Sequence, residues 1–197
     1  LLEQENVDKL SVVLVDCSSS DFTIEKAKVV YPNIKIVKYK GEYFPGHSIN
    51  LGVKHLKNVN YLVILSAHCI PIGKKWLHNL IKPLEEDNKI AGSYCRQIPT
   101  AASSSENRRD LLNTFSIESR IQKVDTFFHN AASIIRFNCW KECPFDHTLK
   151  HIEDRYWAKE IIKKGWKIFY NGGCSVIHEH GLNQHEIAYS SFRGEEV

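Results

Sequence analysis

The feature that most constrains the fold is an alternation of short β-branched runs with helically spaced segments in the first half of the chain. Four runs are predicted strands: residues 11–16 (SVVLVD), 34–39 (IKIVKY), 61–66 (YLVILS) and 90–96 (IAGSYCR). Three intervening segments have apolar side chains at helical spacing: residues 22–31, 47–57 and 73–86. This order is typical of an α/β fold with a mostly parallel central sheet. Right-handed crossovers would bring the carboxyl ends of the strands to one edge, where ligands bind.

The second half of the chain has a less regular pattern. Helices are predicted at residues 108–123 and 152–164, and strands at residues 131–137, 167–170 and 175–178. No repeat or linker divides the chain, so a single domain covering residues 1–197 is expected.

Composition narrows the classes of partner and compartment. A net charge of +3 is too small to indicate a nucleic-acid partner, although it suits an anionic substrate or membrane surface. The six cysteines form no CxxC pair, and no apolar run is long enough to span a bilayer. These observations favour reduced thiols in a cytoplasmic protein. The chain contains no methionine, which indicates a segment of a longer protein.

Three places in the first half carry candidate binding residues: the ends of two predicted strands and the entry to one predicted helix. Asp16 ends a strand, where a carboxylate can bind a base or ribose or simply form a turn. The stretch FPGHSINLG enters a helix whose free N–H groups could receive a phosphate, although the stretch alone favours an ordinary helix entry. His68 and Cys69 follow the strand YLVILS, where they can bind a divalent cation or pack in the interior.

Two further groups stand in the second half. Glu153 and Asp154 open a helix, where they complement its dipole or act as a general base. His178 and His180 alternate on a strand and so share one face, as two ligands of one metal would.

Taken in order, these motifs resemble those of the family 2 nucleotide-sugar glycosyltransferases, which have the GT-A fold. VDCSSSD resembles the family's V-D-D-G-S-T-D, and INLG stands where R-N-x-G is found. LSAHCIP occupies the place of the DxD motif, the Glu-Asp pair matches the acids that supply the base, and VIHEH resembles V-x-H-x-H. The resemblance implies a nucleotide-sugar-binding half at residues 1–99 and an acceptor and catalytic half at residues 100–197.

The resemblance also implies roles for individual residues. Asp154, or less favourably Glu153, would be the catalytic base. The nucleotide-sugar would be bound by five residues: Asp16, Asn50, Gly52, Ser66 and His68. A metal, if used, would be held by His68, His178 and His180.

Two departures from the family pattern affect the donor site. Ser66 and His68 replace the two DxD carboxylates, and Ile49 replaces the arginine of R-N-x-G. Hard cations prefer carboxylate oxygen, while imidazole suits Mn²⁺ or softer ions better than Mg²⁺. The use of a divalent cation is therefore left open, and His68 could instead contact the diphosphate directly. The family's first strand would precede LLEQ, so part of the nucleotide pocket is expected to lie outside this segment.

The expected activity is transfer of a hexosyl or deoxyhexosyl group, with inversion, from a nucleoside-diphosphate sugar to a glycan or lipid-linked acceptor. The resemblance suggests surface polysaccharide synthesis, with peripheral association at the inner face of the plasma membrane. Two alternatives remain: a non-catalytic nucleotide-sugar-binding or scaffold domain, and a histidine-metal phosphoester hydrolase.

Overall fold

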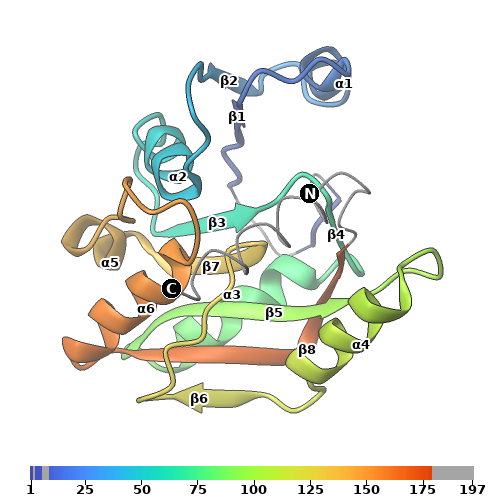
Figure 1. The fold of residues 1–197 in the computed structure, drawn as a ribbon. Coiled ribbons are helices and arrows are strands. Elements are labelled where there is room, and N and C mark those ends of the chain that lie inside the picture. The colour runs from blue at the N-terminus through green and yellow to red at the C-terminus, as the bar shows by residue number, and fades with distance from the viewer. Residues whose placement is uncertain (2, 6–8, 179–197) are drawn as a thin grey trace, which may run out of the picture.

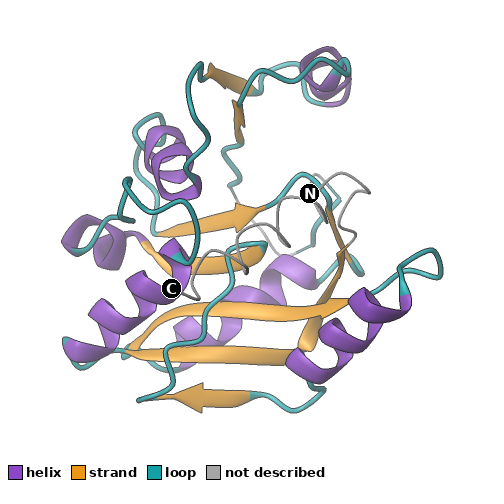
Figure 2. Cartoon of the chain, in the orientation of Figure 1, coloured by secondary structure: helices purple, strands orange, loops and turns teal. Residues whose placement is uncertain are grey.

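The computed structural model describes residues 1, 3–5 and 9–178, which form a six-stranded sheet with helices on both faces and a separate two-stranded sheet (Figures 1 and 2). The strands are β1 (Val13–Asp16), β2 (Lys35–Lys38), β3 (Tyr61–Leu65), β4 (Cys69–Pro71), β5 (Ile90–Ile98), β6 (Arg120–Gln122), β7 (Ala132–Arg136) and β8 (Lys167–His178). The helices are α1 (Thr23–Val30), α2 (Pro45–Val53), α3 (Trp76–Glu86), α4 (Ser105–Thr114), α5 (Phe137–Glu142) and α6 (Glu153–Lys163).

The six-stranded sheet has the order β3-β7-β5-β8-β4, and β6 pairs with the first part of β8. β5 and β8 are parallel, and β7 runs antiparallel between β3 and β5. β3, β5 and β8 therefore share one direction, while β4, β6 and β7 oppose it. The predicted α/β class is confirmed, with a mixed pairing of strands in this sheet.

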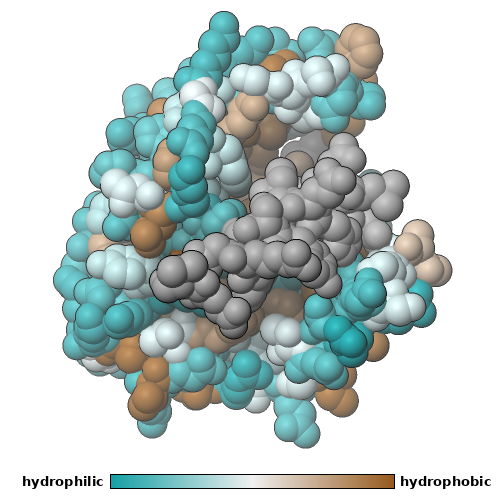
Figure 3. Space-filling view, in the orientation of Figure 1, coloured by the Kyte–Doolittle hydropathy of each residue, from teal (hydrophilic) through white to brown (hydrophobic). Residues whose placement is uncertain are grey.

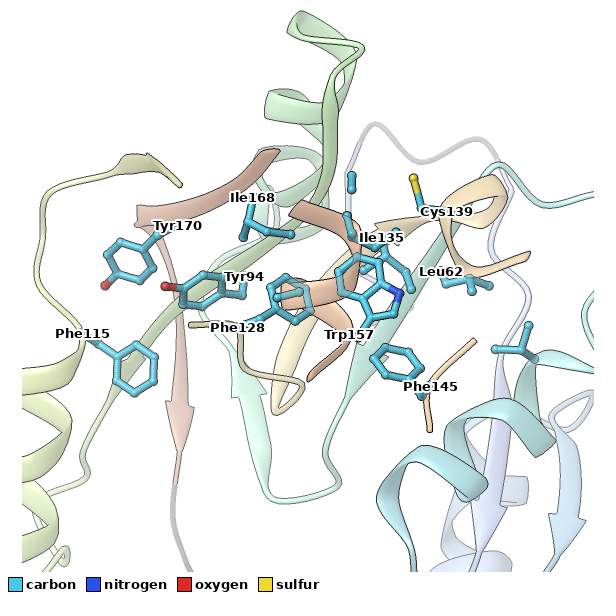
Figure 4. Close-up of a cluster of buried hydrophobic side chains, with 14 of the residues drawn as sticks. Leu62, Tyr94, Phe115, Phe128, Ile135, Cys139, Phe145, Trp157, Ile168 and Tyr170 are labelled. Atoms are coloured by element: carbon cyan, nitrogen blue, oxygen red, sulfur yellow. The ribbon is translucent and has the colours of Figure 1, made fainter. Parts of the chain in front are cut away.

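Two packed clusters cover opposite faces of this sheet. α3 contributes Trp76, Leu77, Leu80 and Leu84 to one cluster, all at most 1% exposed. α6 packs Trp157, Ala158 and Ile161 on the other face, against side chains that include Phe128 and Tyr94 (Figure 4). Burial of this apolar surface supplies most of the driving force that holds the helices to the sheet.

The chain between α4 and β7 differs from the prediction. A helix over residues 108–123 is wrong beyond Thr114, where α4 ends. Phe115 is 3% exposed and enters the core, and Arg120 then pairs with Tyr170 of β8. The free edge of β8 and the buried position for Phe115 outweigh the helical propensity of this segment.

β8 is one long strand where two short ones are predicted. Its register against β5 shifts between Asn171 and Ser175, beside Gly172 and Gly173. A Cβ on Gly172 would collide with the carbonyl oxygen of Ile117, so this close approach of two backbones requires glycine. The irregularity lets β6 and β4 pair with the same edge of β8 at its two ends.

The chain from β1 to the end of α2 forms a second layer beside the main sheet. β1 and β2 pair in parallel, and α2 packs on β1, where Gly52 approaches Val15 closely. α1 buries none of its residues, and Val29 of this helix is 82% exposed. Hydrophilic residues cover most of the face that is drawn in space-filling form, outside the grey atoms (Figure 3). No helix among the described residues is long and apolar enough to cross a membrane.

Candidate functional site

Two histidines meet where β3, β4 and β8 come together. His68 lies in the turn between β3 and β4, and His178 is the last residue of β8. Their Nε2 atoms are 2.8 Å apart, and the rings stack with centroids 4.8 Å apart at an interplanar angle of 18°. The structure therefore brings together two of the three predicted metal ligands. The third, His180, lies outside the described residues.

Cys69 joins this histidine pair. It is paired with His178 across the antiparallel strands β4 and β8, so both side chains lie on the same face of the sheet. The ligand atoms of His68, Cys69 and His178 all lie within 4.8 Å of one another. Burial raises the pKa of the Cys69 thiol to about 12.

The acid pair at the start of α6 is held by Asn130. The Asn130 side-chain amide donates to Glu153 Oε1 at 3.1 Å, and its backbone N–H donates to Asp154 Oδ2 at 3.1 Å. Its Oδ1 accepts a hydrogen bond from Ser133 at 3.1 Å. The backbone N–H and side-chain amide N–H of Asn130 therefore orient the two carboxyl groups. The hydrogen bond from Ser133 in turn orients the Asn130 side chain.

The two acids differ in environment. Glu153 is 5% exposed, whereas Asp154 is half-buried. Burial, and next the charge of Asp154, raise the pKa of Glu153 to about 7, although the Asn130 hydrogen bond acts in the opposite direction. Ile152, which precedes them, has φ of +60°, a left-handed conformation that is unfavourable for a β-branched residue. Such strain persists only where surrounding structure enforces it, and here it sets the entry of the acids.

The dipeptide His129-Asn130 connects the acids to the histidines. The His129 ring meets the His178 ring edge-to-face, with centroids 6.1 Å apart. Sequence reasoning missed both residues because they precede a strand, β7, whose direction and neighbours a local pattern does not show. Since β7 is antiparallel, its start lies beside the end of β3, where the Ser66 N–H donates to the Ala131 carbonyl at 2.9 Å. The strand run at residues 131–137 was visible in the sequence, but its direction was not.

Asp16 lies at a cleft between the ends of β1 and β2. It is 5% exposed, and its Oδ1 accepts the N–H of Ser19 at 3.3 Å. The cleft has a volume of about 250 Å³ and is lined in part by Lys38 and Lys40, which the sequence analysis did not single out. Glu25 also lines the cleft, so two carboxylates and two lysines offer hydrogen-bond partners of both signs to a polar ligand.

Three other residues, Asn50, Gly52 and Ser66, are also predicted to bind the donor. The Asn50 amide donates to the Phe145 carbonyl at 2.6 Å and accepts from Trp140 Nε1 at 2.8 Å. A Cβ on Gly52 would lie 2.9 Å from Val15, so this position provides close packing of α2 on β1. Ser66 lies beside the histidine pair, at the end of β3. Donor binding by these three residues stays a prediction.

A larger cavity lies at the opposite, amino-terminal ends of β1 and β2. Its volume is about 470 Å³, and its lining includes Ser11, Lys35 and Lys54. It contains none of the predicted site residues. The candidate functional site is therefore assigned to the smaller cleft, the histidines and the acids, because these contain the predicted site residues.

A family comparison identifies the chain. The model of the family described as "Glycosyl transferase family 2" matches residues 1–143. The chain belongs to this family. The acid pair and His178 lie beyond the matched residues. A search of curated proteins finds no significant match.

Solved glycosyltransferases have a similar fold. A Pyrobaculum calidifontis mannosyltransferase in complex with GDP-Man and Mn²⁺ has a TM-score of 0.71 at 19% identity, over 96% of this chain and 54% of its own. GalNAc-T7 with UDP, GalNAc and Mn²⁺ has a TM-score of 0.65 at 15% identity, over 86% and 38%. S. aureus TarS has a TM-score of 0.65 at 15% identity, over 86% and 53%.

These identities establish the shared fold alone. The chain spans about half, or less, of the length of these structures. The GT-A arrangement predicted for the family 2 chain is confirmed by this likeness.

Proposed function

We propose that this family 2 chain is the catalytic domain of an inverting glycosyltransferase. It would transfer a hexosyl or deoxyhexosyl group from a nucleoside-diphosphate sugar to a hydroxyl of a glycan or lipid-linked acceptor. The observation that carries the proposal is the link made by His129 and Asn130. These adjacent residues join a histidine pair suited to a diphosphate with an acid pair suited to deprotonating a hydroxyl.

The donor would bind along the edge formed by the ends of β1, β3 and β8. Asp16 supports binding of the nucleoside because it is a nearly buried carboxylate that lines a cleft at the end of β1. Lys38 and Lys40 line the same cleft and would attract the negatively charged donor. His68 would then face the diphosphate, where an imidazole N–H offsets charge that develops on the leaving group.

The acid pair would activate the acceptor. Asp154 is the more accessible of the two acids, so we assign it the role of general base. Glu153, with its pKa raised to about 7 chiefly by burial, suits a supporting role beside it. Attack of the acceptor oxygen on the anomeric carbon, opposite the departing diphosphate, would give a single displacement and an inverted product.

A divalent cation remains part of the proposal, since two of the similar structures contain Mn²⁺. His68 and His178 would hold it. Their neighbouring donor is the thiol of Cys69, and the cluster formed by these three described residues includes no carboxylate. Mg²⁺ and Mn²⁺ prefer oxygen ligands, so this donor set fits them poorly, and we assign no step to either ion.

The biological setting is proposed from the family resemblance. We infer a role in surface polysaccharide synthesis in the cytoplasm, with peripheral contact to the inner face of the plasma membrane and no nucleic-acid partner. Co-sedimentation with anionic vesicles tests the membrane contact, and protein that stays in the supernatant would argue against it.

The decisive experiment is calorimetric titration of the full protein with UDP, GDP, dTDP and CDP, each with and without Mn²⁺. We expect one nucleotide to bind clearly better than the others, and His68→Ala to weaken that binding. A folded protein that binds none of the four would refute the glycosyltransferase proposal. Binding without transfer to any acceptor or to water would instead support the non-catalytic alternative, and phosphoester cleavage without an acceptor would support the hydrolase.

A further inference from the structure

We propose that His68, Cys69 and His178 form a metal site that selects Zn²⁺ over Mg²⁺ and Mn²⁺. The inference goes beyond the proposed function because it concerns the identity of the metal and assigns Cys69 as a ligand. It does not require that the chain transfers a sugar. The argument rests on where the fold places three side chains and on the chemistry of their ligand atoms.

The placement follows from the pairing of β4 with β8. Cys69 and His178 face each other across these antiparallel strands, which fixes both on one face of the sheet. His68 precedes Cys69 directly and reaches the same point from the turn, since its Nε2 lies 2.8 Å from Nε2 of His178. Two elements distant in sequence therefore deliver three ligands to one place.

The spacing of the ligand atoms suits a small ion. All three lie within 4.8 Å of one another, and the two imidazole nitrogens are closer still. Ligand atoms around a tetrahedral zinc ion lie roughly 3–4 Å apart, given Zn–N bonds of about 2.0 Å and Zn–S bonds of about 2.3 Å. Side-chain adjustments of about 1 Å would therefore be sufficient, without movement of the strands.

The donor chemistry selects the ion. Imidazole nitrogen and thiolate sulfur suit Zn²⁺, whereas Mg²⁺ and Mn²⁺ favour carboxylate and water oxygen. A coordinated thiol loses its proton to the metal, so Cys69 would bind as a thiolate. Among the described residues, these side chains supply three of the four ligands that a tetrahedral zinc ion takes. His68 is only half-buried, which leaves the cluster accessible from solvent.

The test is metal binding in the absence of any nucleotide. The metal-free full protein is titrated with Zn²⁺, Mn²⁺ and Mg²⁺ by calorimetry, and with Co²⁺ by absorption spectroscopy, because Co²⁺ reports both tetrahedral geometry and thiolate ligation. The variants are Cys69→Ser and His68→Ala. The matched control is Cys139→Ser, which alters another buried thiol, in the other core cluster.

We expect Zn²⁺ to bind at least 100-fold more tightly than Mn²⁺. The Co²⁺ complex should show a thiolate-to-cobalt charge-transfer band that Cys69→Ser removes and Cys139→Ser retains. His68→Ala should weaken Zn²⁺ binding at least tenfold, and it provides a second test if Cys69→Ser fails to fold. Equal affinity for Mn²⁺ and Zn²⁺, or a Co²⁺ spectrum without the thiolate band, would overturn the proposal. Because no nucleotide is present, the metal titration tests the zinc site independently of the glycosyltransferase proposal. Either proposal can fail while the other stands.

Discussion

The six-stranded body and the layer formed by β1, α1, β2 and α2 differ sharply in how they are packed. Within the body, Leu80, Ile134 and Ile161 are completely buried. In the layer, α1 buries nothing, and each strand buries one residue, Asp16 in β1 and Val37 in β2. The acids and histidines therefore belong to the well-packed body, while the predicted nucleoside cleft belongs to the layer, which buries fewer side chains. Elements with few buried contacts open at lower free energy than core strands do.

The largest expected effect is a loss of transfer rate on mutation of an acid in the body, with nucleotide binding in the layer unchanged. Asp154→Asn should lower the transfer rate by roughly 10²- to 10⁴-fold, because a general base contributes about that much. Nucleotide affinity should be unchanged, and so should the midpoint of urea unfolding. Steady-state kinetics with the best donor provide the measurement, with Glu153→Gln as the companion variant. An unchanged rate in Asp154→Asn would remove the residue from its proposed role.

Core truncations should sharpen the packing contrast. Trp157 is 1% exposed and donates to the Cys143 carbonyl, so Trp157→Ala should lower the free energy of unfolding by about 3–5 kcal/mol. Val37→Ala in the layer should cost only roughly 1–2 kcal/mol. Urea denaturation measures both, and hydrogen exchange should show faster exchange in β2 than in β5. Comparable costs for the two variants would contradict the contrast.

A pH effect is expected from the buried acid of the body. Burial, and next the charge of Asp154, raise the pKa of Glu153 from its ordinary value of 4.5 to about 7 in the folded protein. Between pH 4.5 and pH 7, the Glu153 carboxyl is therefore protonated in the folded protein and ionised in the unfolded chain. Stability contributed by the protonated carboxyl is complete below about pH 4.5 and is lost as the pH rises through 7, by at most about 3 kcal/mol.

Unfolding free energies at pH 5 and pH 8 test this effect. Glu153→Gln should flatten the difference, since the amide mimics the protonated acid. Glu106→Gln, in exposed α4, serves as the control and should leave the pH dependence as it is in the parent protein. A parent protein that is equally stable at both pH values would show that Glu153 is not perturbed.

The contact between the two regions depends on Asn50. Its amide joins α2 to Trp140 and to the Phe145 carbonyl, so Asn50→Ala would leave both groups without this partner. The expected cost is about 1–3 kcal/mol, and faster hydrogen exchange should appear in α2 before it appears in β5. The exposed Asn113→Ala is the matched control. If Asn50→Ala weakens nucleotide binding without loosening α2, direct donor binding is the better account of Asn50.

The smallest effect concerns Asp16. Asp16→Asn should weaken binding of the preferred nucleotide by roughly tenfold, or about 1.4 kcal/mol, because the carboxylate loses its charge-assisted hydrogen bond. Catalysis at saturating donor should change little. Calorimetry with the parent and Asp16→Asn measures the affinity. A loss confined to kcat would break the proposed division between a binding layer and a catalytic body.

The α/β class, the family and the residue types at the site could be predicted from the amino-acid sequence alone. Short β-branched runs and helical spacing are local signals, so β1, β3, β5 and α6 are found within a few residues of their predicted positions. Asp16, His68 and the Glu153-Asp154 pair were recognisable because they directly flank such elements.

Which of these residues lie together depends on the tertiary structure. Strand direction and pairing depend on contacts distant in sequence: β7 runs antiparallel, which brings His129 and Asn130 to the site, and β4 pairs with β8, which places Cys69 beside His178. The same free edge of β8 converts the end of the predicted helix at residues 108–123 into β6. Such pairings are selected by burial and hydrogen bonding in the folded chain, so no local pattern encodes them.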